Sequence, residues 1–178
     1  MSQNVIAERY ALALFMLAKE QNLIEDLTVE MRTLKKVLTE NPSFLTLLSS
    51  PKLTLNEKKN VLQNVFSSVS PTVENTLMLL LDAHRQNEIT DVAEAYINLA
   101  NEESGIADAL VYSARPLSSE ESHAVSASFA AKVGKRSLNI ENIVDTNLLG
   151  GLKIRIGNRI FDGSLRGKLD RLERTLTT

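Results

Sequence analysis

The sequence has 178 residues, of which 43% are apolar, 24% are charged and 4% are aromatic, so it has the composition of a folded globular protein with an aliphatic core. It has no cysteine, two histidines and no apolar run near the ~20 residues of a membrane span, which excludes disulfides and argues against zinc sites and membrane-spanning helices. The net charge of −2 is uneven, because residues 1–105 hold 9 basic and 14 acidic side chains whereas residues 136–178 hold 8 and 5. Such asymmetry suggests two regions that face different partners.

The first hundred residues have the pattern of six short antiparallel helices. Most of the predicted starts carry an N-capping side chain, followed by a glutamate three residues later or by a proline in the first turn. Between the starts, apolar residues recur at steps of three and four, as on the buried face of a helix. The first helix is predicted at residues 5–20, and the other five begin at Asn22 with Glu25, at Asn41-Pro42, at Thr54 with Glu57, at Ser70-Pro71 and near Glu88.

Two of these helices are unusual because they contain uninterrupted apolar runs. Residues 10–18 read YALALFMLA, and residues 77–81 read LMLLL. A helix at the surface of a bundle normally keeps one polar face, whereas a helix that is apolar all round is buried on every side. Either both helices are interior, or they leave an apolar groove in which a helix of a partner protein lies. The residues alone leave both alternatives open.

The periodicity changes near Gly105 from helical to mixed, which predicts a small α/β domain over residues 106–178 after a six-helix bundle over residues 1–105. The predicted elements of this second domain are strands at 107–114, 137–144 and 151–157, a hairpin turn at Gly157-Asn158, and helices that begin at Ser118, with Glu121 completing a capping box, and at Ser164.

A glycine-rich stretch at residues 150–167, GGLKIRIGNRIFDGSLRG, has the residue types of a phosphate-binding loop. A Walker loop needs four residues between its glycines and a hydroxyl after its lysine. Here only three residues separate Gly163 from Gly167, and Leu169 follows Lys168. The dinucleotide pattern fails as well, because the glycines at the start of the stretch precede a strand instead of joining a strand to a helix. The glycines are therefore assigned to turns and close packing, and no cofactor is predicted.

The sequence also lacks a catalytic constellation. His84 and His123 lie in separate predicted domains, and neither stands near a nucleophile pattern. We therefore expect a protein without enzymatic activity. The basic C-terminal region leaves open an alternative of another class, a helical nucleic-acid-binding module, whose affinity for its ligand would fall steeply with salt.

The most specific pattern of the chain lies in its C-terminal domain, and two further stretches accompany it, RYALALF at 9–15 and VYSARPLS at 111–118. The pattern is Leu138-x-Ile140-x-x-x-Val144-Asp145-x-x-Leu148-x-Gly150-Gly151-Leu152-x-Ile154-Arg155-x-Gly157. Together these stretches resemble, over the whole chain, the delta subunit of bacterial F-type ATP synthases, a family known in mitochondria as the oligomycin-sensitivity-conferring protein. One departure is His84, which stands where the family often has glycine at a helix end.

The resemblance implies a mainly α protein, with six helices in residues 1–105 that bind the catalytic head and a small α/β domain in residues 106–178 that contacts the stalk. It implies a non-catalytic stator subunit that holds the head against the torque of the rotor. One copy is expected in each complex, at the cytoplasmic face of the bacterial plasma membrane. The implied partners are the alpha subunits of the head, with the beta subunits as further candidates, and the b subunits of the peripheral stalk. Neither a cofactor nor nucleic acid is expected.

The resemblance also indicates where these partners bind. The family lays a helix of an alpha subunit in the groove between the first and fifth helices, which gives a reason for the two apolar runs. The residues predicted to line this groove are Tyr10, Ala13, Leu14 and Leu17 from the first helix and Leu77, Leu79, Leu80 and Ala83 from the fifth. The residues predicted for the b-subunit contact are Leu165, Arg166, Leu169 and Leu172 in the last helix.

Overall fold

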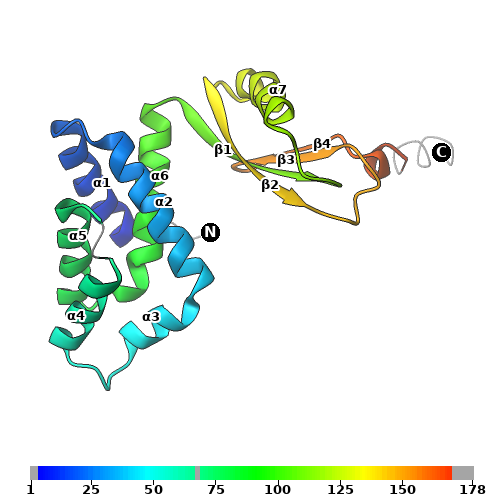
Figure 1. Cartoon of the computed structure of the whole chain (residues 1–178). Coiled ribbons are helices and arrows are strands. Elements are labelled where there is room, and N and C mark those ends of the chain that lie inside the picture. The colour runs from blue at the N-terminus through cyan, green and yellow to red at the C-terminus, as the bar shows by residue number, and fades with distance from the viewer. Residues whose placement is uncertain (1–3, 67–68, 170–178) are drawn as a thin grey trace. The chain divides into compact units, whose positions relative to one another are not determined.

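The structure is a computed structural model that describes residues 4–66 and 69–169 of the chain. The chain divides into two compact units, Met1–Ala100 and Asn101–Thr178. The first unit is helical and the second combines helices with a four-stranded sheet, as Figure 1 shows. This confirms the predicted fold class, a mainly α protein with a helical bundle followed by a small α/β domain.

The first unit contains six α-helices in the part of the chain that the structure describes (Figure 1). They are joined by short connections, which favour antiparallel neighbours in a bundle. The helices are α1 (Val5–Glu20), α2 (Ile24–Glu40), α3 (Pro42–Ser49), α4 (Leu55–Val65), α5 (Pro71–Asp82) and α6 (Ile89–Glu103), with a 3-10 turn η1 (Gln86–Glu88) before α6.

The core of the bundle is aliphatic apart from a few aromatic side chains. Tyr96 of α6 is fully buried, and its ring packs edge-to-face on Phe15 of α1 at a centroid distance of 6.1 Å. The Tyr96 hydroxyl donates to the carbonyl oxygen of Ile24 at 3.4 Å, so burial leaves the hydroxyl with a hydrogen-bond partner. Other deeply buried side chains of this core are Ala11, Leu27, Met31, Leu38, Leu48, Leu62, Val73, Leu77, Leu80 and Val92.

The predicted caps of α4 and α5 are confirmed. Thr54 and Glu57 form a reciprocal capping box at α4, and the backbone N–H of Thr54 donates to the Glu57 carboxylate at 2.8 Å. At α5 the hydroxyl of Ser70 accepts from the N–H of Val73 at 3.4 Å. The same hydroxyl donates to the carboxylate of Glu30 at 2.8 Å, which ties the start of α5 to α2.

The predicted cap of α2 at Asn22 is wrong. Helix α2 begins at Ile24 without a side-chain cap, and Asn22 instead ends α1 in a left-handed conformation with a φ of 56°. The N–H of Asn22 donates to the carbonyl of Lys19 at 3.3 Å, and that of Leu23 donates to Ala18 at 2.9 Å. These bonds satisfy the last carbonyls of α1. Because asparagine tolerates the left-handed region and the connection is short, Asn22 closes one helix and does not open the next.

Asn41 also departs from its predicted role. Helix α3 begins at Pro42, as predicted, but the Asn41 side chain makes no capping bond to it. Its amide nitrogen donates to the carbonyl of Val37 at 2.9 Å, near the end of α2. The side chain therefore serves the C-terminus of the preceding helix, where carbonyl groups lack helical partners.

His84 follows the end of α5 in the same left-handed conformation in which Asn22 follows the end of α1. His84 has a φ of 55°; its N–H donates to Leu81 at 2.9 Å, and the N–H of Arg85 donates to Leu80 at 2.8 Å. This is the helix end at which glycine is favoured, because glycine adopts a positive φ without strain. The positive φ therefore explains why the family that the chain resembles often has glycine at this position.

The second unit is a four-stranded sheet with a helix across one face (Figure 1). The strand order is β2-β1-β3-β4, in which β1 and β2 are parallel and the other pairs are antiparallel. Helix α7 supplies the crossover that a parallel pair needs. The elements are β1 (Ile106–Ser113), α7 (Ser119–Ala130), the 3-10 turn η2 (Ala131–Val133), β2 (Ser137–Val144), β3 (Leu152–Ile156) and β4 (Arg159–Asp162), and residues 165–169 are helical.

The register of the sheet places one set of alternating residues under α7. Ala109 pairs with Ile156, and Val111 pairs with Ile154. All four are buried and form a core with Val125 of α7. Because side chains alternate along a strand, the residues between these positions point to the opposite face of the sheet.

Two glycines of the 150–167 stretch are required by the backbone. Gly151 has a φ of 83°, and a Cβ placed on it would lie 2.5 Å from the carbonyl oxygen of Gly163. Gly157 has a φ of 56° in the tight turn between β3 and β4 that the sequence predicts. The glycines therefore serve a close backbone approach and a hairpin, as interpreted from the sequence.

Replacing His84 with glycine is expected to raise the free energy of unfolding by about 1 kcal/mol, because the left-handed conformation costs an L-residue roughly 1–2 kcal/mol. The His84 side chain is exposed, so its removal loses little packing. Urea denaturation followed by circular dichroism measures the change. Asn22→Gly is the matched control and should gain less, since asparagine tolerates a positive φ better. A less stable His84→Gly protein would contradict this account of the helix end.

Candidate partner-binding surfaces

Helix α1 is apolar both on the face that packs into the bundle and on the face that meets solvent. Its buried residues are Ala7, Ala11, Leu14, Phe15 and Ala18. Its exposed apolar residues include Leu12, Ala13, Met16 and Leu17. The apolar run at residues 10–18 therefore does not mark a wholly interior helix, and that alternative is wrong for α1.

Helix α5 shows the same division with fewer exposed apolar side chains. Leu79 is 59% exposed and Ala83, at the end of the helix, is exposed as well. Leu77 and Leu80 are buried in the core, as Leu14 of α1 is. The predicted groove set is corrected accordingly: these three leucines lie on the inward stripes of their helices and pack the bundle.

Leu79 and Ala83 lie on the exposed side of α5. Helix α4 is tied to α5 by the ion pair between Lys59 and Asp82, at 2.6 Å. Helix α1 also packs against α5. Leu79 and Ala83 are four residues apart, so they share one side of α5.

Tyr10 connects α1 to the residue that follows the end of α5. The Arg85 guanidinium lies 5.7 Å from the centroid of the Tyr10 ring, within the range of a cation–π contact. Its Nη1 donates to the Tyr10 hydroxyl at 3.5 Å. Tyr10 is half-buried, so it forms the border of the exposed apolar residues. We call the set Tyr10, Ala13, Leu17, Leu79 and Ala83 the α1–α5 surface.

Two exposed apolar residues of α1 were not predicted from the sequence. Leu12 and Met16 are 44% and 59% exposed. Inside an uninterrupted apolar run every position looks alike, and no polar residue marks the outward face. The pattern of small residues at positions 7, 11 and 18 was the one available signal, because small side chains favour the close packing of a helix.

Three of the four residues predicted for the b-subunit contact lie in the described helix at 165–169. Leu165 and Leu169 are 48% and 57% exposed, and Arg166 is exposed. Leu172 lies outside the described residues. The helix is anchored to the glycine turn, because the N–H of Leu165 donates to the carbonyl of Gly150 at 3.0 Å.

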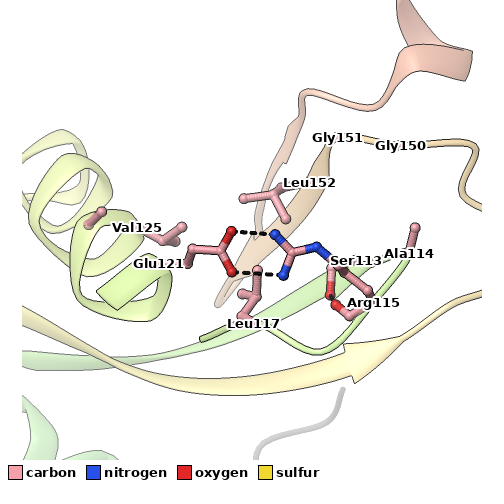
Figure 2. Close-up of a pocket in the computed structure, with 10 residues that line it drawn as sticks. Ser113, Ala114, Arg115, Leu117, Glu121, Val125, Gly150, Gly151 and Leu152 are labelled. Carbon is pink, nitrogen blue, oxygen red and sulfur yellow. Dashed lines mark hydrogen bonds and ion pairs between the residues drawn. The ribbon is translucent and has the colours of Figure 1, made fainter. Parts of the chain in front are cut away.

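A cavity of about 530 Å³ opens between α7 and the glycine turn, on the α7 side of the sheet. Figure 2 shows Leu152 beside an ion pair in which Arg115 and Glu121 form two bonds, at 2.6 and 3.0 Å. Glu121 also accepts from the N–H of Ser118 at 2.9 Å, which completes the predicted capping box of α7. The hydrogen bonds from Arg115, and then that from the Ser118 backbone, lower the pKa of Glu121 to about 2.

A second cavity of about 470 Å³ lies beside the other half of α7. Phe129 of α7 packs edge-to-face on Phe161 of β4 at 5.3 Å, and the Lys132 ammonium lies 4.4 Å from the Phe129 ring centroid. Both cavities border on Leu152 of β3. The lining is largely apolar, so it suits side chains of a partner better than a charged ligand.

Neither a metal centre nor a membrane span is found in the described part of the chain. Among residues 4–66 and 69–169, no group of three or more His, Asp or Glu side chains is placed to hold a metal ion. No helix within these residues is long and apolar enough to cross a membrane.

A helical bundle and a small α/β unit, each with apolar side chains exposed at its surface, define the chain as a binding protein of two parts. The family model for the ATP synthase delta (OSCP) subunit matches residues 6–176. The ATP synthase subunit delta of Anoxybacillus flavithermus is 51% identical over 99% of both chains, and that of Priestia megaterium is 47% identical over 99% of this chain and 97% of its own. A chain of the mitochondrial ATP synthase hexamer of Toxoplasma gondii has a similar fold, with a TM-score of 0.72 and 23% identity over 98% of this chain and 99% of its own.

The chain therefore belongs to the ATP synthase delta (OSCP) subunit family. It is a non-catalytic stator subunit of an ATP synthase, which confirms the function that the resemblance implies.

Replacing Glu121 with glutamine is expected to lower the midpoint of thermal unfolding at neutral pH and to have less effect as the pH falls. An unfolded glutamate titrates near pH ~4.3, well above the folded pKa of about 2. The stabilisation by the carboxylate is therefore fully present above the unfolded pKa and is lost as the pH falls through the folded pKa. Thermal unfolding of both proteins over this range measures the difference. A difference that did not change with pH would contradict the role of the charged pair.

Proposed function

We propose that this stator subunit is a connector with two ends. Its N-terminal unit binds the alpha subunits of the catalytic head through the α1–α5 surface, with the beta subunits as further contacts. Its C-terminal unit binds the b subunits of the peripheral stalk. The observation that carries the first half of the proposal is the exposure of Leu17 and Leu79, at 40% and 59%, on two helices that pack together.

The chemistry of the α1–α5 surface favours an amphipathic helix as its ligand. Covering a leucine that is about half exposed contributes roughly 1 kcal/mol, and several such residues in one patch indicate an interaction site. Ala13 and Ala83 have small side chains, so a helix can approach closely over them. The resemblance also implies a helix as the ligand, because the family binds a helix of an alpha subunit between its first and fifth helices.

For the C-terminal unit, the exposed leucines of the helix at 165–169 support contact with the b subunits. Leu165 and Leu169 stand four residues apart, so they form one apolar stripe, and Arg166 adds a positive charge beside it. A stator must be held at both ends, because torque on the head can be resisted only through a continuous connection to the stalk.

The surroundings of the protein follow from its family. The bacterial relatives are subunits of ATP synthases. We accordingly place the chain at the cytoplasmic face of the plasma membrane, held there by its partners, in one copy per complex and without a cofactor. The alternative of a nucleic-acid-binding module has no support among the relatives.

The replacements Ala13→Glu and Leu17→Glu should each weaken binding of an alpha-subunit N-terminal peptide by at least about 100-fold, because an unpaired carboxylate covered by an apolar partner costs several kcal/mol. Both positions are exposed in the free protein, so the helical circular dichroism should be unchanged. Titration calorimetry measures the affinity. Val29→Glu, at a valine of α2 that is 65% exposed, is the matched control and should bind normally. Loss of helicity, or equal weakening by all three variants, would exclude the α1–α5 surface.

The two-ended arrangement is tested in membranes stripped of this subunit. The full chain is expected to restore coupled ATP synthesis, whereas residues 1–105, residues 106–178 and a mixture of the two should not, because load must pass through the covalent link between the units. Circular dichroism of each fragment establishes first that it is folded. Restoration by residues 1–105 alone would refute the proposed role of the C-terminal unit.

A further inference from the structure

The side chain of Arg85 joins the end of α5 to α1. Its guanidinium carbon lies 5.7 Å from the centroid of the Tyr10 ring, and its Nη1 donates to the Tyr10 hydroxyl at 3.5 Å. Both side chains are half-buried. Because Tyr10 borders the α1–α5 surface, Arg85 acts at the edge of the surface proposed to bind the head.

The backbone of Arg85 is fixed to α5. His84 is in the left-handed conformation, and the N–H of Arg85 donates to the carbonyl of Leu80 at 2.8 Å. This is the longer of the two hydrogen bonds of a Schellman ending, which holds the residue after the left-handed one against the last turn of its helix. The arginine side chain therefore starts from a defined place on α5.

The end of α1 has the same backbone but a different residue in the place of Arg85. There Leu23 follows the left-handed Asn22, and its N–H donates to the carbonyl of Ala18 at 2.9 Å. An apolar residue is usual at this position, where it packs on its own helix. Leu23 packs against the core of the bundle. At α5 the position holds an arginine, whose side chain reaches the neighbouring helix.

The contact between Tyr10 and Arg85 is directional, whereas the core that α1 and α5 share is aliphatic at residues such as Leu14, Leu77 and Leu80. Burial of apolar surface is non-directional, so it holds two helices together without fixing the side chains at their border. A cation beside an aromatic ring and a hydrogen bond to its hydroxyl restrict where the ring can lie. Arg85 thus restricts the one aromatic side chain of the α1–α5 surface.

We infer that Arg85 is a positioning residue of the α1–α5 surface: it holds the Tyr10 ring against the end of α5, in the arrangement that a partner helix meets. This inference rests on the proposed binding of the alpha subunits and adds the residue that shapes the surface. Arg85 acts through Tyr10, and a surface that is already arranged loses less free energy on binding than one that must first be ordered.

The first test uses the full chain and the alpha-subunit N-terminal peptide in titration calorimetry. Arg85→Gln removes the cation and is expected to weaken binding about three- to fivefold, as for the loss of one exposed cation–π contact. Lys59→Gln is the matched control, because it breaks the ion pair to Asp82 at the same end of α5 and leaves Tyr10 and Arg85 in place. Its affinity should stay within about twofold of the unaltered chain.

A double-mutant cycle separates a positioning role from direct contact with the partner. In a Tyr10→Leu chain no ring is left to hold, so Arg85→Gln should change the affinity less than about 1.5-fold. An equal cost in both backgrounds would show that Arg85 itself binds the partner and would overturn the positioning role. Unchanged affinity of Arg85→Gln in the Tyr10 chain would overturn it too.

The second test observes the ring without the partner. The chain has three tyrosines, Tyr10, Tyr96 and Tyr112, so fluorine NMR of the 3-fluorotyrosine protein gives three resonances, of which Tyr10→Leu identifies one by its loss. Arg85→Gln should shift and narrow the Tyr10 resonance, because the ring gains freedom. The other two resonances, and all three in Lys59→Gln, should stay. An unchanged Tyr10 resonance would contradict the inference while leaving peptide binding by the unaltered chain intact. Failure of the unaltered chain to bind the peptide would remove the proposed function, and the inference with it.

Discussion

The close packing of α1 into the bundle depends on three alanines along its inner face. Ala7, Ala11 and Ala18 are at most 1% exposed and alternate along this face with the buried side chains of Leu14 and Phe15. The distance between packed helices is set by the side chains at their contact, and alanines allow the shortest approach. Other large side chains of the same apolar run, Leu12, Met16 and Leu17, are left at the surface. A stable core and an exposed apolar patch thus arise from one short segment.

The ends of the helices fix where that patch lies. Residues in the left-handed region, Asn22 after α1 and His84 after α5, turn the chain sharply and satisfy the last carbonyls of both helices. The turn at His84 also delivers Arg85 to the ring of Tyr10, which links the end of α5 to α1. The α1–α5 surface is therefore bordered by the contact between Arg85 and Tyr10.

The C-terminal unit differs from the bundle, because α7 packs on one face of its four-stranded sheet. Arg115 and Glu121 line the first cavity beside α7, Lys132 and Asp162 line the second, and the rest of both linings is largely apolar. The Arg115–Glu121 pair is exposed, and Glu121 also accepts from the Ser118 N–H, so the pair ties Arg115 to the start of α7.

The sequence by itself determined the element types, their order and most of their starts. Helical periodicity, the boxes at Thr54 and Ser118 and the hairpin glycine are local signals that depend on a few neighbouring residues. The resemblance carried by the C-terminal pattern supplied the family, because that pattern reflects turns and close approaches such as that of Gly151 to Gly163, which other residues cannot make.

Only the tertiary structure decided which apolar residues are core and which are surface. Leu14, Leu77 and Leu80 cannot be told from Leu17 and Leu79 by composition, because each apolar run offers the same side chains to every direction around the helix. The choice depends on where the neighbouring helices lie, and that position depends on contacts between segments far apart in the chain. The same reason explains Asn22: its side chain suits either a helix start or a helix end, and the packing of α1 against α2 selects the end.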